Sequence, residues 1–192
     1  MTPPPFTLVT GNPGKLREAR RLWPGTFDAL DLDLPEIQSL DLAEVLRAKA
    51  DEARRSLRGP LVVEETGLEL AAFGGFPGPL VKWMLAAVGA EGVARAAIAL
   101  GDARATARCM LLFDDGERRI LAEGETTGAL VLPPRGTQGF GWDPVFQPAG
   151  ETLTYGELSA ERKDEIGHRG RAWRALALGL RKAGIPLDSM TH

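Results

Sequence analysis

Residues 6–18 have the sequence FTLVTGNPGKLRE, in which a short apolar run meets a turn and then a helical pattern. The run Phe6 to Val9 predicts a buried strand that ends at the turn Thr10-Gly11-Asn12. Asn12 is a favoured N-cap residue, and Pro13 is favoured at the first position of a helix. The segment therefore predicts a strand, a turn and a helix, which is a common opening of an α/β domain.

The rest of the chain changes pattern near its middle. Strand and helix patterns alternate up to about residue 100, and antiparallel strand patterns follow. Together they predict an α/β or α+β fold with a mixed sheet, in which residues of about 104–132 form a second lobe of one domain. The predicted elements are strands at 27–32, 61–63, 104–113, 118–122 and 126–132, helices at 41–57, 79–88 and 93–100, and a closing helix around Ala172, Leu176 and Leu180.

Composition excludes several classes of protein. The 192 residues are 44% hydrophobic and 26% charged, which is typical of a soluble globular domain. A net charge of −3 provides no basic field for binding nucleic acid, so we expect no such partner. The start Met1 to Pro5 lacks the features of a signal peptide, and no apolar run is long enough to span a membrane, so we expect a cytoplasmic protein. The single cysteine, Cys109, is interpreted as core packing.

The turn before the first helix is a candidate phosphate site. Thr10 to Lys15 would place free backbone N–H groups at the positive end of the helix dipole. Gly11 and Gly14 allow close approach, and Lys15 adds a positive charge. An ordinary helix cap with a surface lysine has the same sequence pattern.

Two adjacent carboxylates, Glu64 and Glu65, follow the apolar run 61–63, where we expect the strand to end and a crevice to open. Carboxylates without nearby His or Cys suit Mg²⁺, which takes one or two protein carboxylates and completes its shell with water and phosphate. Glu36 ends another short strand and is a third candidate ligand. A solvated acidic loop is the alternative interpretation.

Two further segments carry candidate binding residues. The loop Gly139 to Pro144 contains Phe140 and Trp142 between glycines, where a flat ring can stack on a base or plug the core. A cationic group precedes the closing helix and either contacts phosphate or a base edge or forms a solvated turn; it consists of Lys163, His168 and Arg169.

Taken in order, five short motifs resemble those of the inosine triphosphate pyrophosphatase family, the non-canonical purine NTP pyrophosphatases, over nearly the whole chain. They are TGNPGKLRE at 10–18, LPEIQ at 34–38, ETGL at 65–68, GGFPGP at 74–79 and GFGWDP at 139–144. The resemblance implies an elongated, two-lobed α/β fold around a twisted mixed sheet, with the active-site cleft between the lobes. It also implies a homodimer and Mg²⁺-dependent cleavage of ITP, dITP or XTP to the monophosphate and pyrophosphate, which cleanses the nucleotide pool.

The resemblance also assigns roles to residues. Glu65 would activate the attacking water, and Glu36, Glu64 and Glu65 would bind magnesium. The implied substrate contacts are Thr10, Gly11, Asn12, Lys15, Lys49, Thr66, Phe140, Gly141, Trp142, Asp143, Lys163, His168 and Arg169.

This chain departs from the family pattern at three places. Glu65 replaces the usual aspartate, Gly167 replaces the serine of a Ser-His-Arg motif, and Asp164 replaces the asparagine of a Lys-Asn pair. These departures leave a second hypothesis open, a nucleotide-binding module with impaired catalysis. A third is the related septum-formation-inhibitor type of pyrophosphatase, which acts on pyrimidine or methylated nucleotides.

Overall fold

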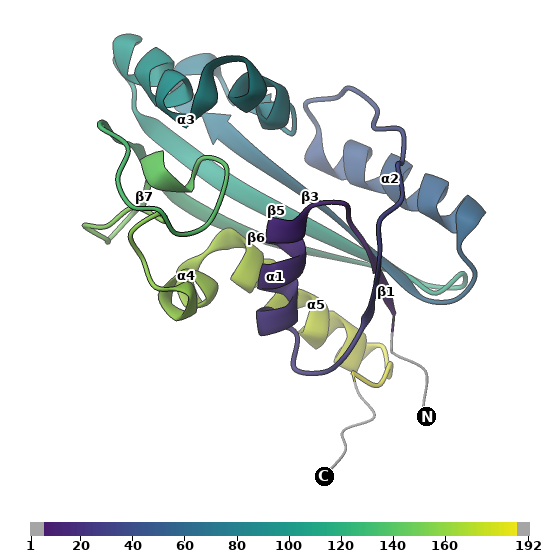
Figure 1. Ribbon diagram of the computed structural model, residues 1–192. Coiled ribbons are helices and arrows are strands. Elements are labelled where there is room, and N and C mark those ends of the chain that lie inside the picture. Colours follow the sequence, from purple (N-terminus) through teal and green to yellow (C-terminus); the bar gives the residue numbers. More distant parts are fainter. Residues whose placement is uncertain (1–5, 188–192) are drawn as a thin grey trace.

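The structure is a computed structural model that describes residues 6–187. Its seven-stranded sheet has the order β2-β1-β3-β5-β6-β7, with β4 paired to β3 (Figure 1). Strand β1 runs parallel to β2 and β3, and the remaining pairs are antiparallel, so the predicted α/β fold with a mixed sheet is confirmed. The elements are β1 Thr7–Val9, α1 Pro13–Leu22, β2 Asp28–Leu30, α2 Leu42–Ser56, β3 Leu61–Leu70, η1 Ala71–Phe73, β4 Pro77–Gly78, α3 Val81–Ala99, β5 Arg104–Asp114, β6 Arg119–Leu130, η2 Asp143–Val145, β7 Phe146–Pro148, α4 Ala160–Ile166 and α5 His168–Lys182.

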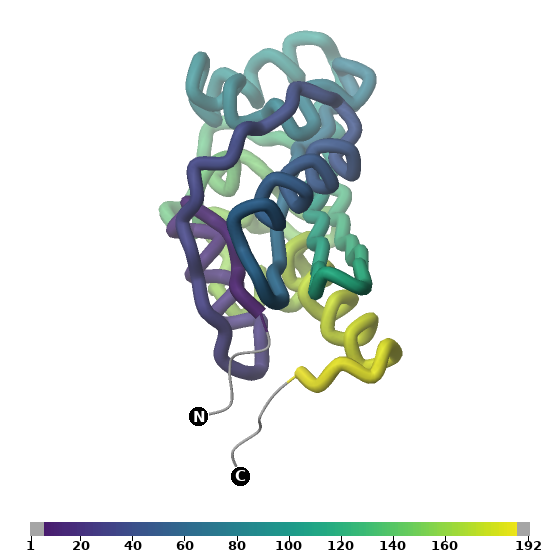
Figure 2. The backbone as a smooth tube through the Cα atoms, turned by 90° about the vertical axis from the view of Figure 1, so that its right-hand side faces the viewer, coloured from purple at the N-terminus to yellow at the C-terminus, as the bar shows by residue number. Residues whose placement is uncertain are grey.

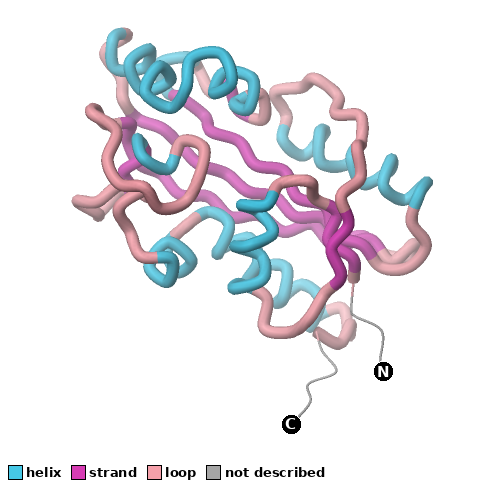
Figure 3. The backbone as a smooth tube through the Cα atoms, viewed as in Figure 1, coloured by secondary structure: helices cyan, strands magenta, loops and turns pink. Residues whose placement is uncertain are grey.

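The helices cover different parts of the long strands β3, β5 and β6, which run through the whole molecule (Figure 3). Successive side chains of a strand point to opposite faces, so Val62 packs under α1 and α5 whereas Val63 packs under α2. Leu68 lies on the same face as Val62 but near the other end of β3, where α3 covers it. Figure 2 shows α3 at one end of the molecule, with β1 and α5 toward the other. The fold is therefore elongated, with a helical layer at each end.

The middle of β3 has an open edge. On the side of β1, pairing ends at Val63, and β4 does not begin to pair until Leu68. On the other side, β5 pairs with β3 from Leu61 to Leu70 without a break. The prediction that the strand itself ends at Glu64 is therefore wrong. The neighbouring strand β1 ends there instead, so residues 64–67 of β3 have no strand partner on that side.

One other prediction about the strands needs correction. The strands expected at 118–122 and 126–132 are one strand, β6. Gly124 lies inside this strand, and a Cβ there would lie 2.2 Å from the carbonyl oxygen of His168 in α5. Glycine thus allows α5 to pack directly on the sheet. The hairpin of β5 and β6 is antiparallel as expected, and β5 pairs with β3 along the whole length of β3.

The helical predictions hold in most places. Helix α2 begins after its N-cap Asp41, whose carboxylate accepts hydrogen bonds from the amides of Ala43 and Glu44. The two helices expected at 79–88 and 93–100 form α3, which is interrupted at Gly89 by a backbone φ of +68°. Helix α4 was not predicted. Within residues 6–187, no helix is both long and apolar enough to cross a bilayer, while the segment Met1 to Pro5 lies outside the described residues.

Candidate active site

A cleft of about 1140 Å³ opens beside the free edge of β3. Its walls come from the start of α1, from Lys49 of α2, from the first turns of α3 and from the loop before η2. The cleft thus separates the end of the molecule that carries α3 from the end that carries α1, α2 and α5. Except for Lys163, every candidate residue proposed from the sequence lines it: Thr10, Gly11, Asn12, Lys15, Glu36, Lys49, Glu64, Glu65, Thr66, Phe140, Gly141, Trp142, Asp143, His168 and Arg169.

The turn after β1 forms the helix cap that the sequence predicts. Asn12 is the N-cap of α1, and its side-chain oxygen accepts hydrogen bonds from the amides of Gly14 at 2.8 Å and Lys15 at 3.1 Å. Pro13 has no N–H to offer. The cap uses the N–H groups of Gly14 and Lys15, so the expectation of free N–H groups is wrong for these two residues. Other phosphate-binding groups of the turn include the hydroxyl of Thr10, the side-chain amide of Asn12 and the ammonium of Lys15.

Lys49 joins two of the predicted metal ligands. Its ammonium contacts Oε2 of Glu65 and lies 2.8 Å from Oε1 of Glu36, so one cation bridges β3 and the loop before α2. Burial of Lys49 opposes its charge, but the two carboxylates outweigh that effect and raise its pKa. The same cation lowers the pKa of Glu36 against the opposing effect of burial.

Lys82, on the opposite wall of the cleft, was missed by the sequence analysis. It lies in the first turn of α3, and its ammonium is 3.9 Å from Oε2 of Glu36. The signal was present, because Lys82 is the only charged residue in the apolar run 73–88.

Glu64 points to the face of the sheet opposite Glu65, as alternation in a strand requires. Its Oε1 accepts hydrogen bonds from Nε of Arg169 at 2.9 Å and from Oγ1 of Thr66 at 3.1 Å, and it lies 3.7 Å from the ammonium of Lys15. Its Oε2 is buried without a hydrogen-bond partner among residues 6–187. An unpartnered carboxylate oxygen in a cleft is unfavourable unless a cation or donor completes it.

Behind Glu64 lies a buried ionic network that the sequence analysis missed. Glu18 of α1 contacts Arg169 and accepts a hydrogen bond from the ammonium of Lys163 at 2.8 Å. Lys163 also donates to Asp143 at 2.6 Å. Burial acts to raise the pKa of Glu18, but Arg169 and Lys163 outweigh it and lower the pKa to about 2. Lys163 and Arg169 are buried, so the alternative of a solvated cationic turn is wrong.

The glycine-rich loop before η2 packs on this network. The ring of Phe140 lies 5.3 Å from the ammonium of Lys163 and 5.4 Å from the guanidinium of Arg169. A Cβ on Gly14 would lie 2.6 Å from that ring, so glycine at this position leaves room for it. Trp142 is half-buried in the cleft wall, and its ring centroid is 6.3 Å from that of His168.

His168, the first residue of α5, is buried with neither ring nitrogen paired within the described part of the chain. Burial, assisted by the charges of Arg169 and Lys163, lowers its pKa well below the ordinary value. The ring is therefore neutral at pH 7 and offers one donor and one acceptor.

Two departures from the family motifs have a local explanation. A Cβ on Gly167 would lie 2.4 Å from the carbonyl oxygen of Lys163, so this backbone favours glycine between α4 and α5. Asp164 forms a two-bond ion pair with Arg21 at 2.8 and 3.0 Å, which fastens α4 to α1.

The carboxylates suit a magnesium ion only in part. Among residues 6–187, no three side chains of His, Cys, Asp or Glu converge on one point. Mg²⁺ needs only one or two protein carboxylates when phosphates and water supply the other ligands. The shared cation position of Glu36 and Glu65 therefore fits a magnesium ion that arrives with a nucleotide, whereas Glu64 lies on the opposite face of β3 and does not converge with them among residues 6–187.

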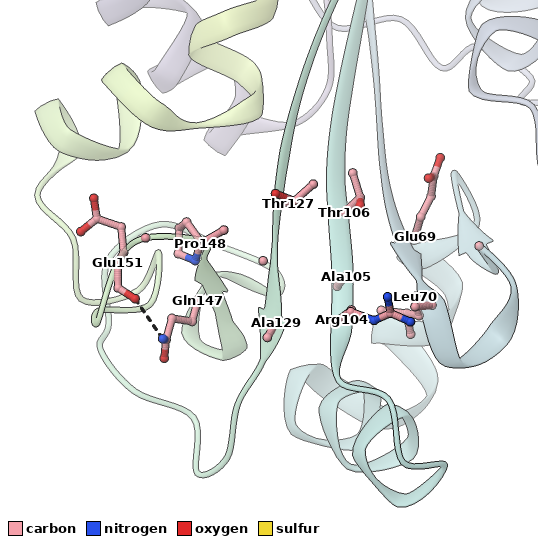
Figure 4. A pocket seen from close by; sticks show the side chains of 15 residues that line it. Glu69, Leu70, Arg104, Ala105, Thr106, Thr127, Ala129, Gln147, Pro148 and Glu151 are labelled. Atoms are coloured by element: carbon pink, nitrogen blue, oxygen red, sulfur yellow. Dashed lines mark hydrogen bonds between the residues drawn. The ribbon is translucent and has the colours of Figure 1, made fainter.

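A second hollow, of about 680 Å³, lies on the sheet near Glu69, Thr106 and Thr127 (Figure 4). Two of its polar side chains have partners nearby: Arg104 pairs with Asp102, and the amide of Gln147 donates to the carbonyl of Glu151 at 2.9 Å. The cationic and aromatic side chains that a nucleotide requires are gathered in the larger cleft.

Comparison with known proteins agrees with this geometry. A family model described as "Ham1 family" matches residues 6–178. A protein named inosine triphosphate pyrophosphatase, from Puccinia graminis f. sp. tritici, is 38% identical over 178 residues, which are 87% of this chain and 92% of that protein. A solved dITP/XTP pyrophosphatase from Mycobacterium abscessus is 30% identical, with a TM-score of 0.61 over 88% of this chain and 97% of its own. A HAM1 protein from Coxiella burnetii shares the fold, with a TM-score of 0.75 at 23% identity over 92% of this chain and 99% of its own. The five motifs, the cleft and these matches together show that the chain belongs to the Ham1 family.

Proposed function

We propose that the protein hydrolyses non-canonical purine nucleoside triphosphates, such as ITP, dITP and XTP, to the monophosphate and pyrophosphate. One observation carries the proposal: a single cleft has lysines beside carboxylates at the open edge of β3, and an aromatic loop on its wall. The lysines fit a triphosphate, and the loop fits a flat base. The names of the relatives from Puccinia and Mycobacterium support the same substrate class.

The triphosphate would be held by cations from three elements. Lys15 comes from α1, Lys49 from α2 and Lys82 from α3, so the phosphates would bridge the two ends of the molecule. Thr10 and Asn12 would add neutral hydrogen bonds at the start of α1. Cations placed where charge develops on the phosphates lower the barrier to their cleavage.

Glu65 would orient and deprotonate the attacking water. In the nucleotide-free protein Lys49 contacts Oε2 of this carboxylate. Oε1 accepts a long hydrogen bond, 3.4 Å, from the amide of Thr66 and keeps a lone pair that can accept a proton from water in the cleft. Attack of that water on the α-phosphorus breaks the bond to the bridging oxygen and releases pyrophosphate. When bound by Glu36 and Glu65, Mg²⁺ would neutralise phosphate charge and stabilise the leaving group.

The purine base of the substrate would be recognised beside η2. Trp142 would stack on the purine, with Phe140, Gly141 and Asp143 shaping the loop. Neutral His168 can donate one hydrogen bond to the 6-oxo group of hypoxanthine or xanthine, whereas adenine presents an amino donor at that position. Arg169 and Lys163 would act indirectly by holding Glu64, Glu18 and Asp143 in place.

The wider assignments are also proposals. We infer one domain, a homodimer, a cytoplasmic location and no nucleic-acid partner. The net charge of −3 supports the last of these, and the exposed apolar side chains of Phe76 and Trp83 support self-association.

A pyrophosphate-release assay with ITP, XTP, dITP, GTP, ATP and UTP in Mg²⁺ tests the function. We expect ITP and XTP to be cleaved with kcat/KM well above that for ATP and UTP. Preference for UTP would favour the septum-formation-inhibitor type, and binding of ITP without turnover would indicate an impaired enzyme.

A further inference from the structure

Lys49 stands at a position where two carboxylates converge. Its ammonium contacts Glu65, which lies on β3, and lies 2.8 Å from Glu36, which lies on the loop before α2. The lysine side chain is 11% exposed, so this contact lies inside the cleft wall. Two carboxylate oxygens from separate segments therefore surround one point, and a lysine nitrogen fills that point.

The same point has the donor set of a divalent cation. Magnesium binds carboxylate oxygens at about 2.0–2.1 Å and takes one or two of them from a protein in nucleotide-processing sites. Small movements of two flexible glutamates would close on such an ion once the ammonium withdraws. Lysine suits this exchange, because its charge sits on a flexible four-carbon stem.

We propose that the ammonium of Lys49 occupies the magnesium position between Glu36 and Glu65 in the nucleotide-free protein. It leaves this position when Mg²⁺ arrives with the triphosphate. The lysine then moves onto the phosphates, so that one side chain first holds the carboxylates in place and later binds substrate. This proposal rests on the assignment of Glu36 and Glu65 as metal ligands. It deepens the proposed function by fixing the order of events: metal and nucleotide enter together.

The charge balance around the cleft supports the same order. Each of the three carboxylates already has a cationic partner. Glu65 contacts Lys49, and Glu36 contacts Lys49 and Lys82. Glu64 contacts Arg169 and Lys15. Free Mg²⁺ thus meets a largely neutralised site. A triphosphate brings several negative charges that can take over the lysines and leave the carboxylates to the metal.

The competing interpretation is that Lys49 is only a structural ion pair. In that case its removal would leave the carboxylates poorly arranged, and Mg²⁺ would bind no better. If Lys49 competes with the metal, its removal exposes a two-carboxylate site and Mg²⁺ binds more tightly.

Calorimetric titration of MgCl₂ into the nucleotide-free, full-length protein distinguishes these cases at constant ionic strength. We expect Lys49→Met to lower the apparent Kd for Mg²⁺ by on the order of tenfold relative to wild type, because a competing charge has gone. The matched control is Arg47→Met, which removes one positive charge from the exposed side of the same helix and should leave the Kd within about twofold. Adding Glu36→Gln to Lys49→Met should abolish the gain.

An apparent Kd in Lys49→Met equal to or weaker than that of wild type would overturn the proposal. Lys49→Gln is titrated alongside, so that the comparison is made in whichever variant retains the native far-UV circular dichroism. Since the titration contains no nucleotide, its outcome is separate from that of the substrate assay. Failure of the proposed function would be seen as absence of pyrophosphate release from ITP by the wild-type protein.

Discussion

Replacing Glu18 by Gln should destabilise the protein strongly, although this residue was given no role by the sequence analysis. Its carboxylate lies between the buried cations of Lys163 and Arg169. The fall of its pKa from the ordinary 4.5 to about 2 corresponds to about 3 kcal/mol of stabilisation of the folded state, at 1.36 kcal/mol per pKa unit. Breaking a buried ion pair by removing one partner typically costs about 3–5 kcal/mol, which agrees with that figure.

The direction of the pKa shift determines how the loss of stability in Glu18→Gln depends on pH. A carboxyl whose pKa is lowered on folding stabilises the protein fully above its unfolded value of about 4.5 and loses that effect as pH falls toward about 2. The difference in unfolding free energy between wild type and Glu18→Gln should therefore be about 3 kcal/mol at pH 7. It should shrink as pH falls below about 4.5.

Urea denaturation followed by circular dichroism at a series of pH values measures this difference. The exposed Glu117→Gln serves as control, because it removes the same charge without a buried partner and should shift stability by less than about 0.5 kcal/mol. A loss below 1 kcal/mol at pH 7, or a difference that does not change with pH, would refute the assignment of Glu18 to a stabilising network.

Three further predictions follow from the cleft and its supports. Trp142→Ala should raise KM for ITP by roughly 5- to 150-fold through loss of about 1–3 kcal/mol of base stacking, and steady-state kinetics with an unchanged KM would make it a core residue instead. Gly124→Ala should lower stability by about 1–3 kcal/mol in thermal unfolding, since its Cβ would lie 2.2 Å from the His168 carbonyl oxygen; an unchanged Tm would show that α5 can move away. Light scattering at micromolar concentration should report a dimer, and a monomer-sized particle would contradict the proposed self-association.

The sequence predicted the fold where local patterns were strong. The turn at Asn12 and Pro13 has the expected cap, and the Asp41 cap of α2 lies where its pattern indicated. The continuation of β3 past Val63 could not be predicted from local sequence. Residues 64–67 lack a strand partner on the β1 side only, and their pairing with β5 depends on residues some forty positions away. The continuity of β6 was not predicted for a similar reason, since the close packing that favours glycine at position 124 comes from a helix far along the chain.

The candidate site was predicted as a set of residues but not as an arrangement. Nearly all of the proposed residues line one cleft, because the motifs that identified them lie at the ends of adjacent elements. The sequence could not show that Glu64 and Glu65 point to opposite faces, since that depends on the strand continuing through them. Nor could it show that Arg169 and Lys163 are buried with Glu18, a contact between residues more than 140 positions apart.

Pyrophosphate release from ITP by the wild-type protein and by Glu65→Gln, measured side by side, tests the central claim most directly. The substitution keeps the size of the side chain but removes the charge and the ability to accept a proton. We expect the wild-type protein to release pyrophosphate from ITP, and Glu65→Gln to be slower by about 100-fold or more, with an unchanged circular dichroism spectrum. Near-normal turnover by Glu65→Gln, or no pyrophosphate from ITP with the wild-type protein, would contradict the account.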